Sequence, residues 1–133
     1  MNIKYMLPWA MLSFLAFAEE PLLQPQTQGE VSFVSGGVGG DERDAMRAMR
    51  QDYNLNLLFS EAGSGSYLSD VKVSIHDANG NSLLDTLANG PLFYAKLKPG
   101  RYTVSVDNNG HTINKTTKVG QQQRTALSFI WPQ

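Results

Sequence analysis

Apolar and polar residues alternate along most of the chain after residue 53. In the stretch VKVSIHD, for example, Val71, Val73 and Ile75 fall on one side of an extended chain, and polar residues stand between them. A period of two is typical of a β-strand with one buried face. The same pattern predicts seven strands, over residues 54–60, 71–77, 81–88, 92–97, 101–106, 111–119 and 124–131.

Short turn sequences separate these strands. Asn79-Gly80 and Asn109-Gly110 are typical of two-residue hairpin turns. Pro99-Gly100 predicts a type II turn, because proline fixes φ and glycine accepts the positive φ that must follow. This spacing predicts a mostly β fold, an antiparallel seven-stranded β-sandwich (prealbumin/Ig-like) with one N-terminal α-helix. The last strand is apolar on both faces, so we expect it in the centre of a sheet.

The helix is predicted over Asp41–Tyr53, DERDAMRAMRQDY. Asp41 suits the N-cap position, where its carboxylate can accept hydrogen bonds from free backbone amides. Met46, Met49 and Tyr53 recur at helical spacing, so this side should face the core. A second stripe on another face consists of Arg43, Arg47 and Arg50.

The first 18 residues have the composition of a secretory signal peptide. Lys4 precedes an apolar run from Met6 to Phe17, and Ala16-Phe17-Ala18 has the small residues of a cleavage site. A membrane anchor and a buried N-terminal helix are the alternatives. We expect residues 19–40 to be a flexible leader, in which weak alternation around Val31 allows a short strand. Residues 41–133 would then form the domain, which predicts a periplasmic or secreted protein without a stable membrane span after cleavage.

Composition excludes several kinds of chemistry. The chain has no cysteine, so it can form neither disulfides nor thiolate metal sites. Its net charge of −1 gives no electrostatic reason to expect nucleic-acid binding. The two histidines, His76 and His111, are expected on exposed strand positions, and no cofactor is predicted. The glycines of residues 36–40 precede the helix, but Asp41 and Glu42 stand where a phosphate loop would need Lys and Ser or Thr.

The segment YLSDVKVSIHDANGNSLLDTLANGPLFYAKLKPGRYTVSV resembles a carboxypeptidase regulatory-like domain. The resemblance depends on the strand with Val71, Val73, Ile75 and Asp77, on the Asn-Gly turn, and on the motif LKPGRYTV of residues 97–104. It covers about half of the mature chain and implies a small prealbumin-like sandwich, which is usually non-catalytic and appended to a larger protein. The helix lies outside this pattern. Together with the strand after it, AMRAMRQDYNLNLLF is also similar to short N-terminal domains of secretins and outer-membrane receptors.

These observations predict an exported, non-catalytic accessory module that binds a protein or a component of the cell envelope. Arg43, Arg47 and Arg50 are the candidate partner-binding residues, and an exposed sheet edge is a second natural route to a partner. Two alternatives stay open. One is a periplasmic enzyme of unrecognised type, which clustering of both histidines with carboxylates would favour. The other is an envelope-docking factor that uses the arginine stripe.

Overall fold

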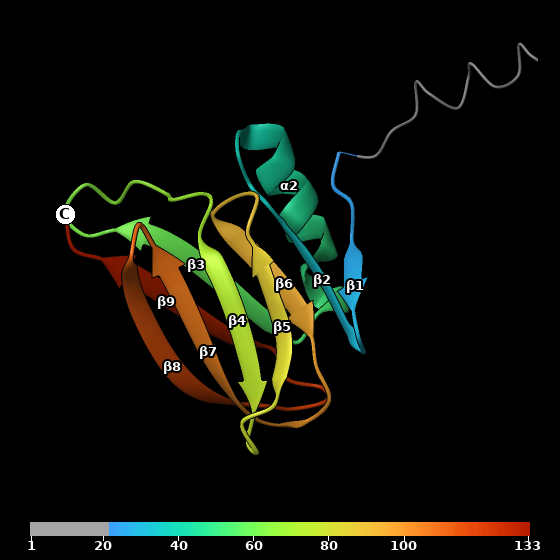
Figure 1. The fold of residues 1–133 in the computed structure, drawn as a ribbon. Coiled ribbons are helices and arrows are strands. Elements are labelled where there is room, and N and C mark those ends of the chain that lie inside the picture. Colours follow the sequence, from blue (N-terminus) through green and yellow to red (C-terminus); the bar gives the residue numbers. More distant parts are fainter. Residues whose placement is uncertain (1–21) are drawn as a thin grey trace, which may run out of the picture.

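The computed structural model describes residues 22–133, which form two facing β-sheets and one α-helix (Figure 1). The five-stranded sheet has the order β1-β2-β6-β3-β9. Its strands are β1 (Gln26–Gln28), β2 (Val31–Gly36), β6 (Leu92–Lys96), β3 (Leu55–Glu61) and β9 (Thr125–Trp131). The four-stranded sheet has the order β5-β4-β7-β8. Its strands are β5 (Ser82–Leu87), β4 (Lys72–Asp77), β7 (Gly100–Asn108) and β8 (His111–Val119).

The mostly β, two-sheet architecture is confirmed, but the strand count and the pairing differ from the prediction. Residues 22–133 contain nine strands, because two more, β1 and β2, lie in the stretch predicted to be a flexible leader. The five-stranded sheet is mixed, since β9 runs parallel to β3. β9 is also an edge strand and not a central one. Ile130 on its outer face is 55% exposed, so the apolar residues of that face do not mark a buried position.

β2 escaped a clear prediction because both of its faces are buried. Phe33 points into the sandwich and stacks on Phe93 of β6, with ring centroids 5.7 Å apart. Val34 points to the opposite side and is buried beneath the helix. A strand covered on both faces shows little alternation of apolar and polar residues.

The main core lies between the two sheets and consists of the predicted inward faces. Val71, Val73 and Ile75 of the β4 region are fully buried, and Val104 and Val106 of β7 are as well. At the β3–β9 end of the core, an aromatic cluster consists of Phe59, Phe129 and Trp131. Because apolar area removed from water is the main favourable term in folding, this layer provides most of the stability.

Both Asn-Gly pairs lie in hairpin connections, but only Asn109-Gly110 forms the predicted two-residue turn, and the Pro-Gly turn is not formed as predicted. Asn79-Gly80 lies in a four-residue connection between β4 and β5, and Asn79 does not have a positive φ. Asn109 and Gly110 both have positive φ, 53° and 86°, as a type I′ turn requires. Gly100 does not have a positive φ but begins β7 and pairs with Val119. The Tyr102 hydroxyl donates a hydrogen bond to the Lys98 carbonyl, 2.5 Å away, and this bond closes the turn instead.

The helix, α2 (Gly40–Met49), is shorter than predicted and is followed by a 3-10 turn, η2 (Arg50–Asp52). Asp41 is not the N-cap; Gly39 occupies that position, and no side chain of residues 22–133 caps the helix there. Instead the Glu42 carboxylate accepts hydrogen bonds from the amides of Gly37 and Val38, at 3.1 and 3.2 Å. Glu42, the residue after Asp41, accepts these two hydrogen bonds, and Asp41 itself is exposed to solvent.

The methionine side of the helix faces the protein, as predicted. Met46 is fully buried and Tyr53 is 7% exposed, and both pack on Val34 and Tyr94 of the five-stranded sheet. Tyr53 and Tyr94 have ring centroids 6.0 Å apart. The helix therefore covers the outer face of this sheet over β2 and β6 (Figure 1).

Side chains join the two sheets at both of their open sides. Gln28 of β1 bonds both the amide and the carbonyl of Asp85 in β5, at 2.8 and 3.3 Å. On the other side, the Trp131 indole donates to the His111 carbonyl at 2.7 Å, and Lys115 donates to the Ser128 carbonyl at 2.6 Å. These contacts connect the two sheets at single positions of β5, β8 and β9.

Residues 1–21, which include the predicted signal peptide, lie outside the described residues. In the part that is described, no helix has the length and apolar character needed to cross a bilayer.

Candidate functional site

The outer face of the five-stranded sheet is only half covered. The helix lies over β2 and β6, while β3 and β9 beside them have no layer above them in residues 22–133. Register places Tyr94, Asn56 and Ala126 in one row across β6, β3 and β9. The next row contains Leu92, Leu58 and Ser128. A step therefore forms between the side of the helix and the bare strip of sheet.

The arginine stripe forms one wall of this step. Arg43, Arg47 and Arg50 line a hollow of about 180 Å³, together with Leu58, Leu92, Tyr94, Pro91 and Tyr67. A neighbouring hollow of about 230 Å³ shares four of these residues and continues over Asn56 and Ala126. We call the two hollows together the arginine groove. The structure thus brings all three predicted residues to one site and adds an apolar floor.

The three arginines are not equivalent. Arg47 forms an ion pair with Asp44, with 2.9 Å between nitrogen and oxygen. Within residues 22–133, neither Arg43 nor Arg50 lies within ion-pair distance of a carboxylate. Two guanidinium groups are therefore available to an acceptor from outside.

Tyr94 lies where the cationic wall meets the floor. Burial raises the pKa of its hydroxyl, and the positive charges of Arg50, Arg47 and Arg124 oppose that rise. The phenol thus stays neutral and faces a positive field, because each of these charges lies close enough to act on it.

Asn56 is the residue of the groove that sequence reasoning missed. Its side-chain nitrogen is buried and has no hydrogen-bond partner in the part of the chain described. An unpartnered buried amide normally costs free energy, so such groups are uncommon in folded proteins. The sequence feature that could have indicated this residue is an asparagine within the strand NLNLLFS, at a position that faces away from the core.

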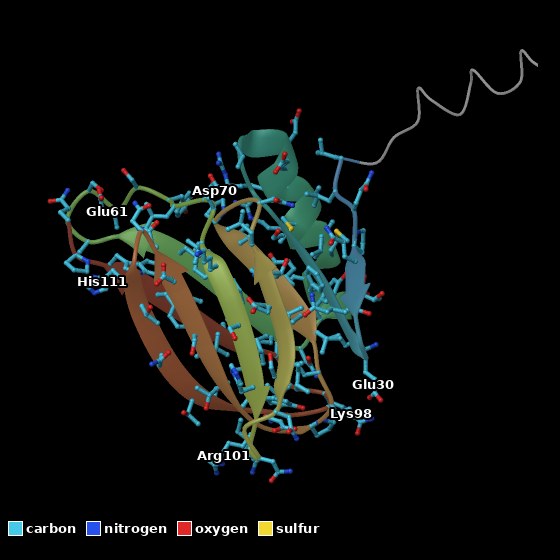
Figure 2. All side chains as sticks on the ribbon, viewed as in Figure 1. Glu30, Glu61, Asp70, Lys98, Arg101 and His111 are labelled. Atoms are coloured by element: carbon cyan, nitrogen blue, oxygen red, sulfur yellow. The ribbon has the colours of Figure 1, made fainter. Side chains whose placement is uncertain are left out.

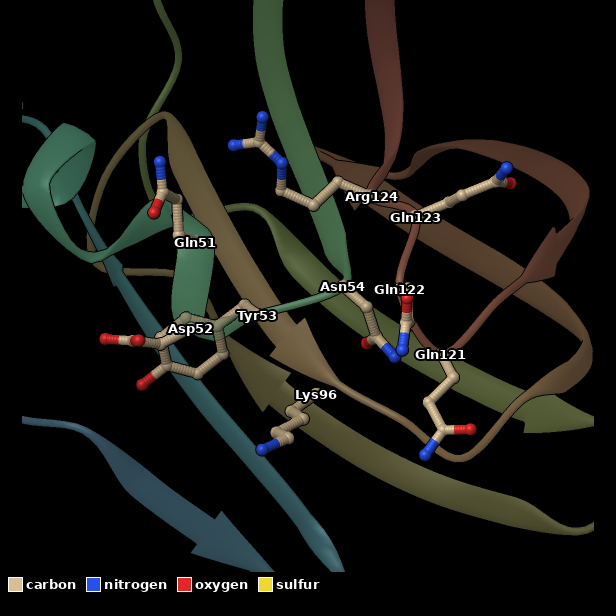
Figure 3. Close-up of a pocket in the computed structure, with 9 residues that line it drawn as sticks. All are labelled: Gln51, Asp52, Tyr53, Asn54, Lys96, Gln121, Gln122, Gln123 and Arg124. Carbon is tan, nitrogen blue, oxygen red and sulfur yellow. The ribbon is translucent and has the colours of Figure 1, made fainter.

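A polar cleft adjoins the groove at the Arg124 end (Figure 3). It has a volume of about 460 Å³. Amide and charged side chains line it: Gln51, Asp52, Asn54, Lys96, Gln121, Gln122, Gln123 and Arg124. Arg124 stands on one side and Lys96 on the other, with Asn54 between them (Figure 3).

Asn54 has a structural task in this cleft. Its side-chain nitrogen donates to the carbonyls of Leu97 and Gly120, at 2.7 and 3.2 Å. Its oxygen accepts a hydrogen bond of 2.9 Å from the Leu97 amide. One side chain therefore ties the start of β3 to the β6–β7 and β8–β9 connections, and its polar atoms are already used.

The two histidines are far apart. His76 pairs with Thr103 and His111 with Asn108, so they face positions of β7 separated by about 17 Å. His111 lies at the end of the sandwich away from Arg101 (Figure 2). No group of three or more histidines and carboxylates suited to a metal occurs within residues 22–133. The clustering that would favour the enzyme alternative is therefore not formed by these two residues.

Backbone amides in the glycine-rich segment before the helix are already hydrogen-bonded to a side chain of the protein. The amides of Gly37 and Val38 already donate to Glu42, so they are not free to hold a phosphate.

Another hollow, of about 410 Å³, lies between the β1 and β5 sides of the two sheets, and an exposed ion pair lines it. Glu30 and Lys98 point toward one another (Figure 2), with 2.6 Å between their charged atoms. The hydrogen bond and charge of Lys98 lower the pKa of Glu30, and Glu30 raises the pKa of Lys98 in return. Both side chains are more than three-quarters exposed, so solvent weakens this pair.

Comparison with known proteins assigns no family to the chain. No protein-family model and no curated protein matches it. A solved structure titled "Crystal Structure of S.CueP" aligns with 94% of this chain and 88% of that chain, at 11% sequence identity and a TM-score of 0.46. A likeness at this level carries no functional argument, so the groove has to be interpreted from its own residues.

Proposed function

We propose that this chain is an exported, non-catalytic binding module and that the arginine groove receives its partner. One observation carries the proposal: the three arginines of α2 and η2 line the same hollow as an apolar floor of Leu58, Leu92 and Tyr94. Arginine and tyrosine are enriched at the centres of protein interfaces, where charged hydrogen bonds and apolar contact combine. The sequence resemblance to carboxypeptidase regulatory-like domains supports a binding role but names no ligand.

The groove is a better route to a partner than a sheet edge. The β5, β8 and β9 edges already exchange hydrogen bonds through Gln28, Lys115 and Trp131. β1 has only three residues, which limits how many bonds an added strand could make. The groove, by contrast, contains two arginines, Arg43 and Arg50, that pair with no carboxylate within residues 22–133, and a buried amide that has no acceptor there.

Photo-crosslinking in cells that produce the protein tests this proposal. A p-benzoylphenylalanine at position 67 would replace Tyr67, which is 56% exposed at the mouth of the groove. The matched control is position 87, since Leu87 is 49% exposed and lies on β5 of the other sheet. We expect a discrete adduct from position 67 that disappears in the Arg43→Glu/Arg47→Glu/Arg50→Glu variant. Identical adducts from both positions, or none from position 67, would count against the groove.

The exported state has its own test. Mass determination of the protein recovered from the periplasm or the medium should give a chain that begins at Glu19. A chain that still begins at Met1 and stays with the membrane fraction would support the anchor alternative.

A further inference from the structure

We infer that the arginine groove recognises an acidic peptide segment of a protein partner, with a carboxylate side chain on the arginines and a neighbouring apolar side chain on the floor. This inference rests on the proposed function and gives the chemistry of the ligand.

The groove offers donors to its ligand. The guanidinium groups of Arg43 and Arg50 have donors only, and within the described chain no carboxylate pairs with them. Asn56 lines the same site, and its side-chain nitrogen is buried there without a partner in residues 22–133. Carboxylate and carbonyl oxygens are the acceptors that suit this set, and arginine binds carboxylate through two parallel hydrogen bonds. A peptide supplies both, from an acidic side chain and from its own backbone.

The charge of the helix disfavours a membrane or another flat polyanion. Residues 41–53 contain three arginines but also four carboxylates, on Asp41, Glu42, Asp44 and Asp52. An extended anionic surface would meet both signs at once and find no net attraction. A single carboxylate that enters the step beside the sheet meets the arginine side alone. The chain as a whole carries −1, so no long-range positive field compensates.

The dimensions suit a peptide more than a lipid chain. The two hollows have volumes of about 230 and 180 Å³ and are open along β3 and β9, so they hold side chains but do not enclose a long tail. β3 has seven residues, which corresponds to a strip about 23 Å long. An extended segment of similar length can therefore lie beside the helix, with Tyr67 at one end and Arg124 at the other.

A selection experiment tests the inference without knowledge of the partner. The purified full chain is offered to a phage-displayed library of random linear peptides, and enriched peptides are measured by fluorescence anisotropy. We expect enriched sequences with an acidic residue beside an aromatic or aliphatic one. Their affinity should fall at least tenfold in Arg43→Gln/Arg50→Gln, because both binding cations are lost.

The matched control removes two cations elsewhere. Arg101→Gln/Lys118→Gln changes a neighbouring cross-strand pair of the four-stranded sheet and should leave the affinity unchanged. Circular dichroism shows whether each variant is folded. Enriched peptides without acidic residues, equal binding by both variants, or no enrichment over the Arg43→Gln/Arg50→Gln protein would overturn the inference.

Vesicles of phosphatidylglycerol and phosphatidylcholine separate this inference from the proposed function. We expect the protein not to sediment with them. Arginine-dependent sedimentation without selection of acidic peptides would refute the peptide ligand while the groove remained a binding site. If the protein selected no acidic peptide, did not sediment with the vesicles and gave no adduct from the crosslinker at position 67, the proposed function itself would fail.

Discussion

Replacing Asn56 by leucine should stabilise the fold, whereas the same replacement at Asn54 should destabilise it. Both asparagines belong to the same sequence stretch, NLNLLFS, two residues apart. Their side chains differ in one respect: Asn54 makes three hydrogen bonds, and the Asn56 nitrogen makes none within the described chain. Comparing the two variants therefore shows how much a hydrogen-bonded side chain stabilises the fold and how much an unpaired buried one destabilises it.

The magnitudes follow from these contacts. At about 1 kcal/mol for each hydrogen bond, Asn54→Leu should lower the free energy of unfolding by about 2–4 kcal/mol, since it also leaves the Leu97 backbone unpaired. An unpartnered buried amide costs about 1–3 kcal/mol. Because Asn56 as a whole is only partly buried, we expect Asn56→Leu to gain about 1 kcal/mol, at the lower end of that range.

Urea denaturation followed by circular dichroism measures both changes. With a slope of about 2 kcal/mol per molar urea, the midpoint should rise by about 0.5 M for Asn56→Leu and fall by about 1–2 M for Asn54→Leu. If the groove binds a peptide, Asn56→Leu should weaken that binding although it makes the protein more stable. Such a trade is common when a polar group serves function at a cost in stability. A midpoint for Asn56→Leu below that of the unchanged protein would refute the reasoning, because it would mean that the amide already has a stabilising partner.

Three further variants test the packing and the charges. In Gly90→Ala, the new Cβ would lie 2.3 Å from a backbone oxygen of β2, so we expect a loss of about 2 kcal/mol or more in urea denaturation. Gly120→Ala is the control, because its nearest neighbour is 3.9 Å away. Trp131→Phe removes the indole hydrogen bond to β8 and also leaves space in the buried aromatic cluster, so it should cost about 2 kcal/mol or more in urea denaturation followed by circular dichroism. No loss would mean that neither contact helps to hold the sheets together. Hydrogen bonds from the Thr112 hydroxyl, the larger cause, and from the Gly110 amide lower the pKa of the Asp107 carboxyl. The ionised carboxylate therefore stabilises the fold fully above the ordinary aspartate pKa of about 3.9, and this stabilisation is lost as the pH falls through the lowered pKa. Asp107→Asn should therefore lose less stability than the unchanged protein between about pH 5 and 2, and equal acid sensitivity would argue against this role.

The parts of the fold that the sequence predicts are those in which one face of a strand is buried and the other is wet. Val71, Val73 and Ile75 alternate with polar residues because the other face of β4 has no covering layer in the described chain. β2 lacks that contrast, since Phe33 faces the main core and Val34 faces the helix. The parallel pairing of β9 with β3 was also hidden, because local alternation contains no information on which strand lies beside which.

The site was predictable to a similar extent. Helical spacing was enough to place Arg43, Arg47 and Arg50 on one side of the helix. The floor was not predictable, because it depends on the order β6-β3-β9, which brings residues 92–94, 56–58 and 126–128 together from distant parts of the chain. The value of Asn56 was hidden for the same reason, since an asparagine becomes an unpartnered donor only once its neighbours are known.

The groove itself follows from the dimensions of the helix and of the sheet. Strands lie about 4.8 Å apart, so five of them span about 19 Å between the axes of the outer two. A helix with its side chains is about 10 Å wide, which is enough for two or three strands, and α2 has only ten residues. Because Met46 of the helix and Tyr53 just after η2 pack over β2 and β6, the uncovered part of the sheet must lie over β3 and β9. Arg43 of α2 and Arg50 of η2 face this strip. The apolar side chains of Leu58 and Leu92 and the buried amide of Asn56 lie beside these charges, which is unusual for a face that only contacts water. A partner that brings carboxylates and apolar side chains together would complete the layer that the helix is too narrow to form.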